Sequence, residues 1–215
     1  MQCDCIGILA PMWGGKTQKL NELASRAVAN DKSVIAIEPK INKRNSEREL
    51  HKIATTYPVE MHDPQDLSEV LQRIMDKSIE VVVLDECHLW SLSEDEGAQF
   101  YDFFYELLHK TYVDIYFSSL VWNCYKKDRE FPLISKLLPW CTDIIFLRAN
   151  CDISSSQDKA TYIFSLDAEN KVGNDYTVVS PYFYRKARRS EQKSLAVPGK
   201  KWNRQERVKA TIFVE

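Results

Sequence analysis

The segment Ala10-Pro11-Met12-Trp13-Gly14-Gly15-Lys16-Thr17 decides the fold class of this chain. It follows a short apolar run, Cys5 to Leu9, and precedes Gln18 to Asn30, in which apolar residues recur at helical spacing. Strand, glycine-rich turn and helix in this order have the spacing of a phosphate-binding loop, with Ala10 at the usual first glycine. The sequence therefore predicts a loop whose backbone N–H groups and helix N-terminus bind phosphate.

Two side chains of this loop are expected to contact the nucleotide directly. Lys16 has the position from which a lysine reaches the β and γ phosphates, and the Thr17 hydroxyl has the position of a Mg²⁺ ligand. The predicted phosphate-binding residues of the loop are Ala10, Pro11, Met12, Trp13, Gly14, Gly15, Lys16 and Thr17.

A second apolar run, Val81 to Leu84, ends in two carboxylates, Asp85 and Glu86. Ligands of an open parallel sheet bind beyond the carboxyl ends of its strands, so we expect Asp85 to face the metal beside the loop. Glu86 is then placed to accept a proton from a hydroxyl group or from water. Two acids that merely end a strand are the alternative, which the upstream loop disfavours. Together the motifs predict nucleotide binding with phosphoryl transfer or hydrolysis, and leave the acceptor open.

Further runs of β-branched and aromatic residues alternate with helical patterns, which is typical of a parallel sheet covered on both faces. The expected strands are 33–37, 113–117 and 143–147, and the expected helices are 67–75 and 97–109. The predicted fold class is α/β, a RecA-like P-loop NTPase sheet flanked by helices.

After Asn150 the pattern changes to shorter and more polar pieces with hairpin character, 161–166 and 176–179. We interpret them as a small C-terminal β appendage. From Arg185 onward the chain is dense in lysine and arginine, which favours a solvated tail over a phosphate or nucleic-acid contact. The expected domains are 1–149 for nucleotide binding, 150–186 for the appendage and 187–215 for the basic tail.

Composition limits the remaining classes of function. The 215 residues suit one main domain, and 44% apolar with 28% charged residues is ordinary for a globular protein. A formal net charge of −2 gives no global attraction to nucleic acid or membrane, and no apolar stretch approaches the roughly 20 residues that span a bilayer. We expect a soluble, cytoplasmic protein with neither partner.

The six cysteines lack the regular spacing of a disulfide framework, and most are expected to be free thiols. Cys3 and Cys5 form a C-x-C pair without a second ligand pair nearby, which favours strand residues over a metal site. Cys87 is interpreted as a small buried residue.

Two known families share these motifs. Asp85-Glu86-Cys87-His88 resembles the second motif of superfamily two helicases, but those motors need two RecA-like domains, and this chain has room for one. The thymidine kinase family is the closer resemblance, from the first strand to about Lys186. Its phosphate loop, G-P-M-F-S-G-K-[ST], is similar to Ala10–Thr17, and its P-x-I-D-x-R is similar to Pro39–Arg44, with Asn42 for Asp.

Three weaker motifs follow in the order of that family. Its D-E-A-Q-F-F resembles 85–90, its L-D-G-T-F motif loosely resembles the stretch from Trp122, and its I-G-G-N-D-x-Y resembles 172–176 in a lasso-like segment. The resemblance implies that Glu86 is the general base and that Arg44 lies near the phosphates. It also implies nucleoside-side roles for Met12, His88, Trp122, Val172, Gly173, Asn174 and Tyr176.

The family's zinc positions are altered in this chain. Two C-x-x-C pairs hold the zinc in the family, and the corresponding residues here are Cys151, Ser154, Ser180 and Phe183. One cysteine cannot hold tetrahedral zinc, so we predict no structural zinc.

The resemblance implies ATP and Mg²⁺ as cofactors, a homotetramer, and phosphorylation of thymidine or a related pyrimidine deoxynucleoside at its 5′-hydroxyl to give dTMP. The altered motifs leave a second hypothesis open, a protein of this fold that binds nucleotide without phosphorylating a nucleoside. A helicase-like ATPase domain is the least favoured alternative.

Overall fold

The apolar runs of the sequence form a six-stranded sheet in the computed structural model, which describes residues 3–41, 57–91, 93–120, 122–123, 129–152, 159–164 and 177–190. The strand order is β3-β2-β4-β5-β1-β8, and each neighbouring pair runs parallel. The strands are β1 (Cys5–Leu9), β2 (Val34–Pro39), β3 (Val59–His62), β4 (Val81–Leu84), β5 (Asp114–Ser119) and β8 (Asp143–Phe146). The predicted α/β fold class is confirmed.

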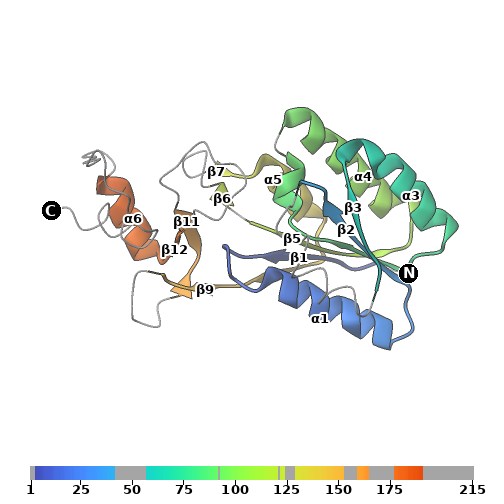
Figure 1. Ribbon diagram of the computed structural model, residues 1–215, viewed down its shortest axis with the longest axis horizontal. Coiled ribbons are helices and arrows are strands. Elements are labelled where there is room, and N and C mark those ends of the chain that lie inside the picture. The colour runs from blue at the N-terminus through green and yellow to red at the C-terminus, as the bar shows by residue number, and fades with distance from the viewer. Residues whose placement is uncertain are drawn as a thin grey trace. The chain divides into compact units, whose positions relative to one another are not determined.

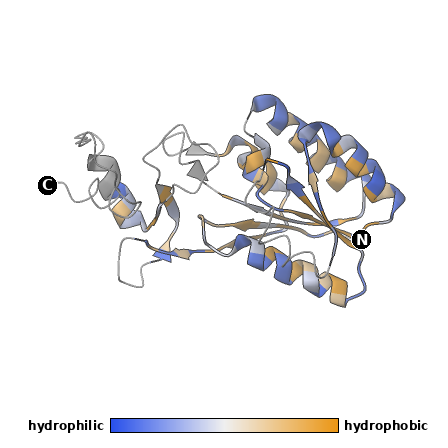
Figure 2. Ribbon diagram, viewed as in Figure 1, coloured by the Kyte–Doolittle hydropathy of each residue, from blue (hydrophilic) through white to orange (hydrophobic). Residues whose placement is uncertain are grey.

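Helices cover both faces of this sheet, because parallel strands need crossover connections. Figure 1 shows α1 (Lys16–Ala29) on one face and α3 (Leu67–Asp76), α4 (Glu94–Lys110) and α5 (Pro132–Leu137) on the other. Figure 2 shows the apolar residues of these helices turned toward the strands. On α1 the buried apolar residues are Leu20, Ala24 and Ala27, which lie on one face at helical spacing.

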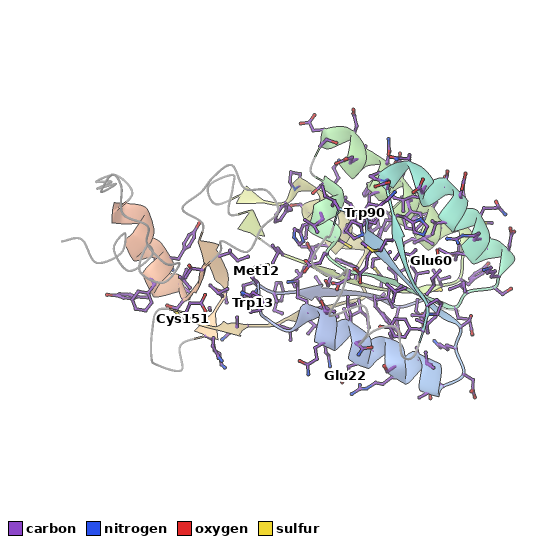
Figure 3. All side chains as sticks on the ribbon, viewed as in Figure 1. Met12, Trp13, Glu22, Glu60, Trp90 and Cys151 are labelled. Atoms are coloured by element: carbon purple, nitrogen blue, oxygen red, sulfur yellow. The ribbon has the colours of Figure 1, made fainter. Side chains whose placement is uncertain are left out.

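The core on the α4 side is rich in aromatic side chains. Trp90, in the 3₁₀ helix η3 (Cys87–Ser91), stacks on Phe100 of α4 with ring centroids 5.2 Å apart, and both are buried (Figure 3). Phe104 meets Phe117 of β5 edge to face at 5.7 Å. These contacts anchor the segment after Asp85 and Glu86 to the helical layer.

The two edges of the sheet differ in charge. On the edge strand β3, Glu60 forms ion pairs with His62 and with Arg73 of α3 (Figure 3). Charged groups on an edge strand discourage pairing with another chain. On the edge strand β8, Ile144 and Phe146 are exposed instead.

The described chain divides into two compact units. The sheet unit comprises Met1–Leu9, Lys16–Val121 and Glu130–Phe146, and the second unit comprises Ala10–Gly15, Trp122–Arg129 and Leu147–Glu215. Short antiparallel pairs join β9 (Ala149–Asn150) to β10 (Lys159–Ala160), and β11 (Tyr162–Phe164) to β12 (Thr177–Val179). A further pair joins β6 (Trp122–Asn123) and β7 (Arg129–Glu130).

The chain after β12 forms a helix, α6 (Pro181–Ser190). The stretch dense in basic residues, which starts at Arg185, therefore begins inside a helix. Tyr184 of α6 stacks on Tyr162 of β11, with ring centroids 4.4 Å apart, which attaches the helix to the strand pair. The predicted lasso, 168–176, and the rest of the tail lie outside the described residues. Within the described part of the chain, no helix has the length and apolar character needed to cross a bilayer.

Candidate active site

Asp85 and Glu86 lie just beyond the carboxyl end of the central strand β4. Strand β4 pairs with β5 so that Leu84 is opposite Phe117. The residues that follow them, Asp85 and Ser118, are therefore neighbours. Parallel register thus brings a carboxylate and a hydroxyl together at the edge of the sheet where ligands of α/β folds bind.

Asp85 accepts hydrogen bonds from two hydroxyl groups. The Thr17 hydroxyl at the start of α1 donates to Oδ2 at 2.7 Å, and the Ser118 hydroxyl donates to Oδ1. The backbone N–H of Glu86 also donates to Oδ1, at 2.9 Å, and to Ser118 Oγ, at 3.2 Å. Thr17 and Asp85, both predicted as Mg²⁺ ligands, are thus hydrogen-bonded to each other in the sheet unit, and their role toward a metal stays a prediction.

Burial dominates the electrostatics of this cluster. Asp85 is 3% exposed, and its burial raises the pKa of the carboxyl group, with the Glu86 carboxylate raising it further. The hydroxyls of Ser118 and Thr17 and the positive charge of Lys16 oppose that rise. Lys16 is itself buried, so its charge acts on Asp85 with little screening by water. The site therefore holds a carboxylate whose charge a cation would stabilise.

Glu86 has a strained backbone. Its φ of +51° lies in the left-handed region, which is unfavourable for a residue with a side chain. Such strain persists where the surrounding structure imposes it, and it gathers at functional sites. Here the two hydrogen bonds from the Glu86 N–H hold the turn, so the side chain leaves the strand in a direction different from that of Asp85.

His88 lies beside the Glu86 carboxylate. Its Nδ1 is 3.4 Å from Glu86 Oε2, and the same nitrogen accepts a hydrogen bond from the Leu120 N–H at 3.3 Å. The ring packs against Phe131, with centroids 5.0 Å apart, and is buried. Because Nδ1 accepts from a backbone N–H, the neutral ring carries its proton on Nε2.

Two buried residues near Asp85 were not predicted from the sequence. Tyr57 donates a hydrogen bond to Asn21 of α1 at 3.2 Å, and burial, together with the charges of Asp85 and Glu38, raises the pKa of its hydroxyl. Glu38, near the carboxyl end of β2, is 1% exposed. A charged residue in an otherwise apolar strand run was the available signal for Glu38.

The loop Ala10–Gly15 belongs to the second unit and folds into a tight turn, in which the Gly14 N–H donates to the Pro11 carbonyl at 3.2 Å. A Cβ at Gly14 would lie 2.6 Å from the Cβ of Ala10, too close for any side chain. Trp13 and Gly15 both have positive φ, +61° and +81°. The Trp13 side chain is exposed, whereas Met12 is buried (Figure 3).

Several other predicted site residues lie outside the described part of the chain: Arg44, Val172, Gly173, Asn174 and Tyr176. For Trp122 the backbone is described, in β6, but the side chain is not. Their roles stay predictions.

Two of the altered zinc positions, Cys151 and Ser180, contact each other. Cys151 is buried, and its Sγ accepts a hydrogen bond from the Ser180 N–H at 3.4 Å. Asp152 binds the Val178 backbone on both sides, donating from its N–H at 2.9 Å and accepting at Oδ2 at 2.8 Å. These hydrogen bonds attach the Cys151 segment to β12. Across the described ranges, no group of three or more histidine, cysteine or acidic side chains is placed to hold a metal.

A family model described as thymidine kinase matches residues 5–175, which is most of the chain. The match begins with β1 and includes the loop, the strand-end carboxylates and the region of the predicted lasso. No curated protein matches the sequence.

Proposed function

This chain belongs to the thymidine kinase family, and from that membership we propose that it transfers the γ-phosphoryl group of ATP to the 5′-hydroxyl of thymidine, giving dTMP. The observation that carries the proposal is the cluster in which Thr17 and Ser118 donate to Asp85 with Glu86 as the next residue. It supports the proposal because it would supply a metal-binding carboxylate and an adjacent base at the carboxyl end of a central strand.

The oxygen atoms of this cluster fit a magnesium ion. Mg²⁺ prefers oxygen ligands and keeps several of its waters, and Thr17 Oγ1 and Asp85 Oδ2 are two such oxygens, 2.7 Å apart. Thr17 would hold the ion directly and Asp85 through water. When bound, Mg²⁺ would neutralise charge on the phosphates of ATP.

The other side chains of the site would bind the phosphates and take up the proton during phosphoryl transfer. Lys16, at the start of α1, would bind the β and γ phosphates, while the loop Ala10–Gly15 and Arg44 complete the phosphate contacts. Glu86 would take the proton of the 5′-hydroxyl as that oxygen attacks the γ-phosphorus and ADP leaves. One oxygen of the Glu86 carboxylate lies 3.4 Å from His88 Nδ1.

Binding of the nucleoside is assigned by family membership. Met12, His88 and Trp122 would contact the substrate, and the lasso with Val172, Gly173, Asn174 and Tyr176 would cover the base and exclude water. The same membership favours a homotetramer, which the molecular mass in solution would test.

The experiment is transfer of labelled γ-phosphate from ATP to a panel of nucleosides by the purified protein, beside Glu86→Gln. We expect labelled dTMP from the wild type, and a loss of at least 100-fold in the variant, because a general base contributes roughly 10²–10⁴-fold. ATP binding should persist in Glu86→Gln. Absence of transfer to any nucleoside, with ATP still bound, would instead favour a protein that binds nucleotide without transferring phosphate.

A further inference from the structure

Two cysteines of the sheet unit lie close together where the neighbouring strands β1 and β8 begin. Cys5 is the first residue of β1, and Cys141 lies two residues before β8. Both are free thiols; Cys5 is 2% exposed, whereas Cys141 is half-buried. Neither is part of the phosphate or carboxylate site.

The register of β1 and β8 sets the distance between them. Ile6 is opposite Asp143, and the Thr142 N–H donates to the Cys5 carbonyl at 2.8 Å, so the ladder continues one residue beyond β8. The Cys5 N–H in turn donates to Thr142 Oγ1 at 3.0 Å. Paired strands lie about 4.8 Å apart, which puts the Cα atoms of Cys5 and Cys141 roughly 6 Å from each other. Disulfides require about 4.4–6.8 Å.

The two side chains also share one face of the sheet. Gly7 lies two residues after Cys5 and so faces the same way, and a Cβ at Gly7 would be 3.1 Å from the Cys141 sulfur. The thiols of Cys5 and Cys141 form a hydrogen bond with each other. The sulfurs are therefore in contact, without a side chain between them.

The environments of the two cysteines shift the pKa values of their thiols in opposite directions. The hydrogen bond that the Cys5 thiol donates to Cys141, and then burial, raise the pKa of Cys5, which stays a thiol. The hydrogen bond with Cys5 lowers the pKa of Cys141, burial opposes this, and the Gly7 backbone lowers it further. A half-exposed cysteine with a lowered pKa beside a buried thiol is the arrangement of an attacking and a resolving cysteine.

We propose that Cys5 and Cys141 form a reversible disulfide that links β1 to β8 when the protein meets a peroxide. The Cys141 thiolate attacks one oxygen of the peroxide, the O–O bond breaks, and a sulfenic acid and hydroxide form; the hydroxide takes a proton to become water. Cys5 then attacks the sulfenic sulfur, loses its proton, and displaces a second water as the S–S bond forms. Two thiols are oxidised, one peroxide is reduced, and a dithiol reductant reverses the reaction.

Cys87 provides a matched control. It is another buried cysteine of the same unit, close enough to influence the charge of Cys5, but its sulfur donates to the Leu84 carbonyl at 3.5 Å. It has no solvent-exposed surface by which a peroxide would reach it. Replacing Cys87 should leave the Cys5–Cys141 reaction intact.

The test uses the full chain, reduced and then treated with limiting hydrogen peroxide, alkylated to block remaining thiols, and digested without reductant for peptide mass mapping. We expect a peptide cross-linked through Cys5 and Cys141, which dithiothreitol removes. The cross-link should persist in Cys87→Ser and be absent in Cys141→Ser. In Cys5→Ala, Cys141 should proceed to sulfinic acid, because no resolving thiol remains.

Wild-type protein alone decides the matter if a variant does not fold. Alkylation of both Cys5 and Cys141 after peroxide treatment would overturn the proposal. So would over-oxidised Cys141 without a cross-link, or a cross-link from Cys141 to a cysteine other than Cys5. None of these readouts depends on phosphoryl transfer, so the disulfide and the proposed kinase activity stand or fall separately.

Discussion

Asp85 is 3% exposed, and burial is the largest cause of the raised pKa of its carboxyl group. A raised pKa means that the folded protein binds this proton more tightly than the unfolded chain does. The resulting stability is complete below the ordinary value of 3.8 and is lost as pH rises through the folded-state pKa. Above the folded-state pKa, without metal or nucleotide, the ionised carboxylate therefore destabilises the fold.

Asp85→Asn removes that charge and keeps an oxygen that accepts from Ser118 or Thr17. We expect it to stabilise the ligand-free protein at pH 7 by roughly 0.5–2 kcal/mol, as substitutions that relieve a functional site often do. The gain should shrink as pH falls toward 5, while phosphoryl transfer is lost. Denaturant unfolding at both pH values measures this. A variant less stable than wild type at both would show that the hydrogen bonds of the carboxylate outweigh its burial.

His88 tests how Glu86 is held. In His88→Leu, the Leu120 N–H and the Glu86 carboxylate both lose their neighbour, Nδ1. We expect kcat to fall about ten-fold with little change in KM, a loss equivalent to about 1.4 kcal/mol, because the Leu120 N–H is left without its acceptor and the Glu86 carboxylate without the ring beside it. His88→Asn places an amide group near the position of Nδ1 and should restore most of the rate. Equal losses in both variants would mean that the ring only fills space.

Individual residues that belong to recognisable motifs were predicted as site residues from the sequence. Residues that only strand pairing brings to the site were missed. Thr17 and Asp85 were both predicted as metal ligands, because loop and strand-end motifs specify residue types at fixed spacing. Ser118 was not predicted, because a serine in a strand carries no signal until the pairing of β4 with β5 places it beside Asp85. The strained backbone of Glu86 was equally invisible.

Helix α4 begins at a hydrogen-bonded polar cap and buries an apolar face. The Ser93 hydroxyl accepts from the Glu96 N–H at 3.2 Å, and the Glu96 carboxylate accepts from the Ser93 N–H at 3.2 Å, which is a capping box. The helix then buries Phe100, Phe103, Phe104 and Leu107 against the sheet.

Ser93→Ala is expected to lower the free energy of unfolding by roughly 0.5–2 kcal/mol, because one helical N–H loses its acceptor. Ser135→Ala, at an exposed position within α5, serves as the control and should change stability little. Urea unfolding of both variants measures the difference. Indistinguishable losses would contradict a capping role for Ser93.

The hydrogen bond between Cys151 and the Ser180 N–H predicts that this segment needs no structural metal. Because hydrogen bonds attach the Cys151 segment to β12, a strong chelator should leave the melting temperature of the nucleotide-free protein unchanged. Cys151→Val should lower it, since the site loses the sulfur that accepts from the Ser180 N–H. A drop in melting temperature with chelator alone would show that a structural metal is present after all.

Elements with strong apolar runs were predicted well, and short or amphipathic ones were not. Apolar or β-branched runs in the sequence predicted strands β1, β2, β4, β5 and β8. Strand β3 was missed because Val59-Glu60-Met61-His62 is short and half polar, as an edge strand with an ion-pair network permits. Helix α6 was missed because its many basic residues indicated a tail.

The whole sheet unit assembles the candidate site from segments far apart in the chain. Thr17 follows β1, Asp85 follows β4, and Ser118 lies in β5, so their hydrogen bonds exist only when the parallel sheet is formed. A ligand that binds this cluster therefore binds the folded state and not the unfolded chain, which couples nucleotide affinity to global stability.

MgATP should accordingly raise the melting temperature of the wild-type protein. At 100 times its dissociation constant the gain is about 2.7 kcal/mol, and each kcal/mol corresponds to roughly 2–4 °C for a chain of this size.

Glu86→Gln should show the same shift in melting temperature with MgATP, because the proposed base acts on the acceptor hydroxyl rather than on the phosphates. Lys16→Ala should abolish most of it if Lys16, which is buried and whose charge acts on Asp85, binds the phosphates as proposed. Scanning calorimetry with and without Mg²⁺ separates the outcomes. An equal shift in Lys16→Ala would place nucleotide binding elsewhere, and a shift in wild type that Glu86→Gln loses would make Glu86 a binding residue instead of a base.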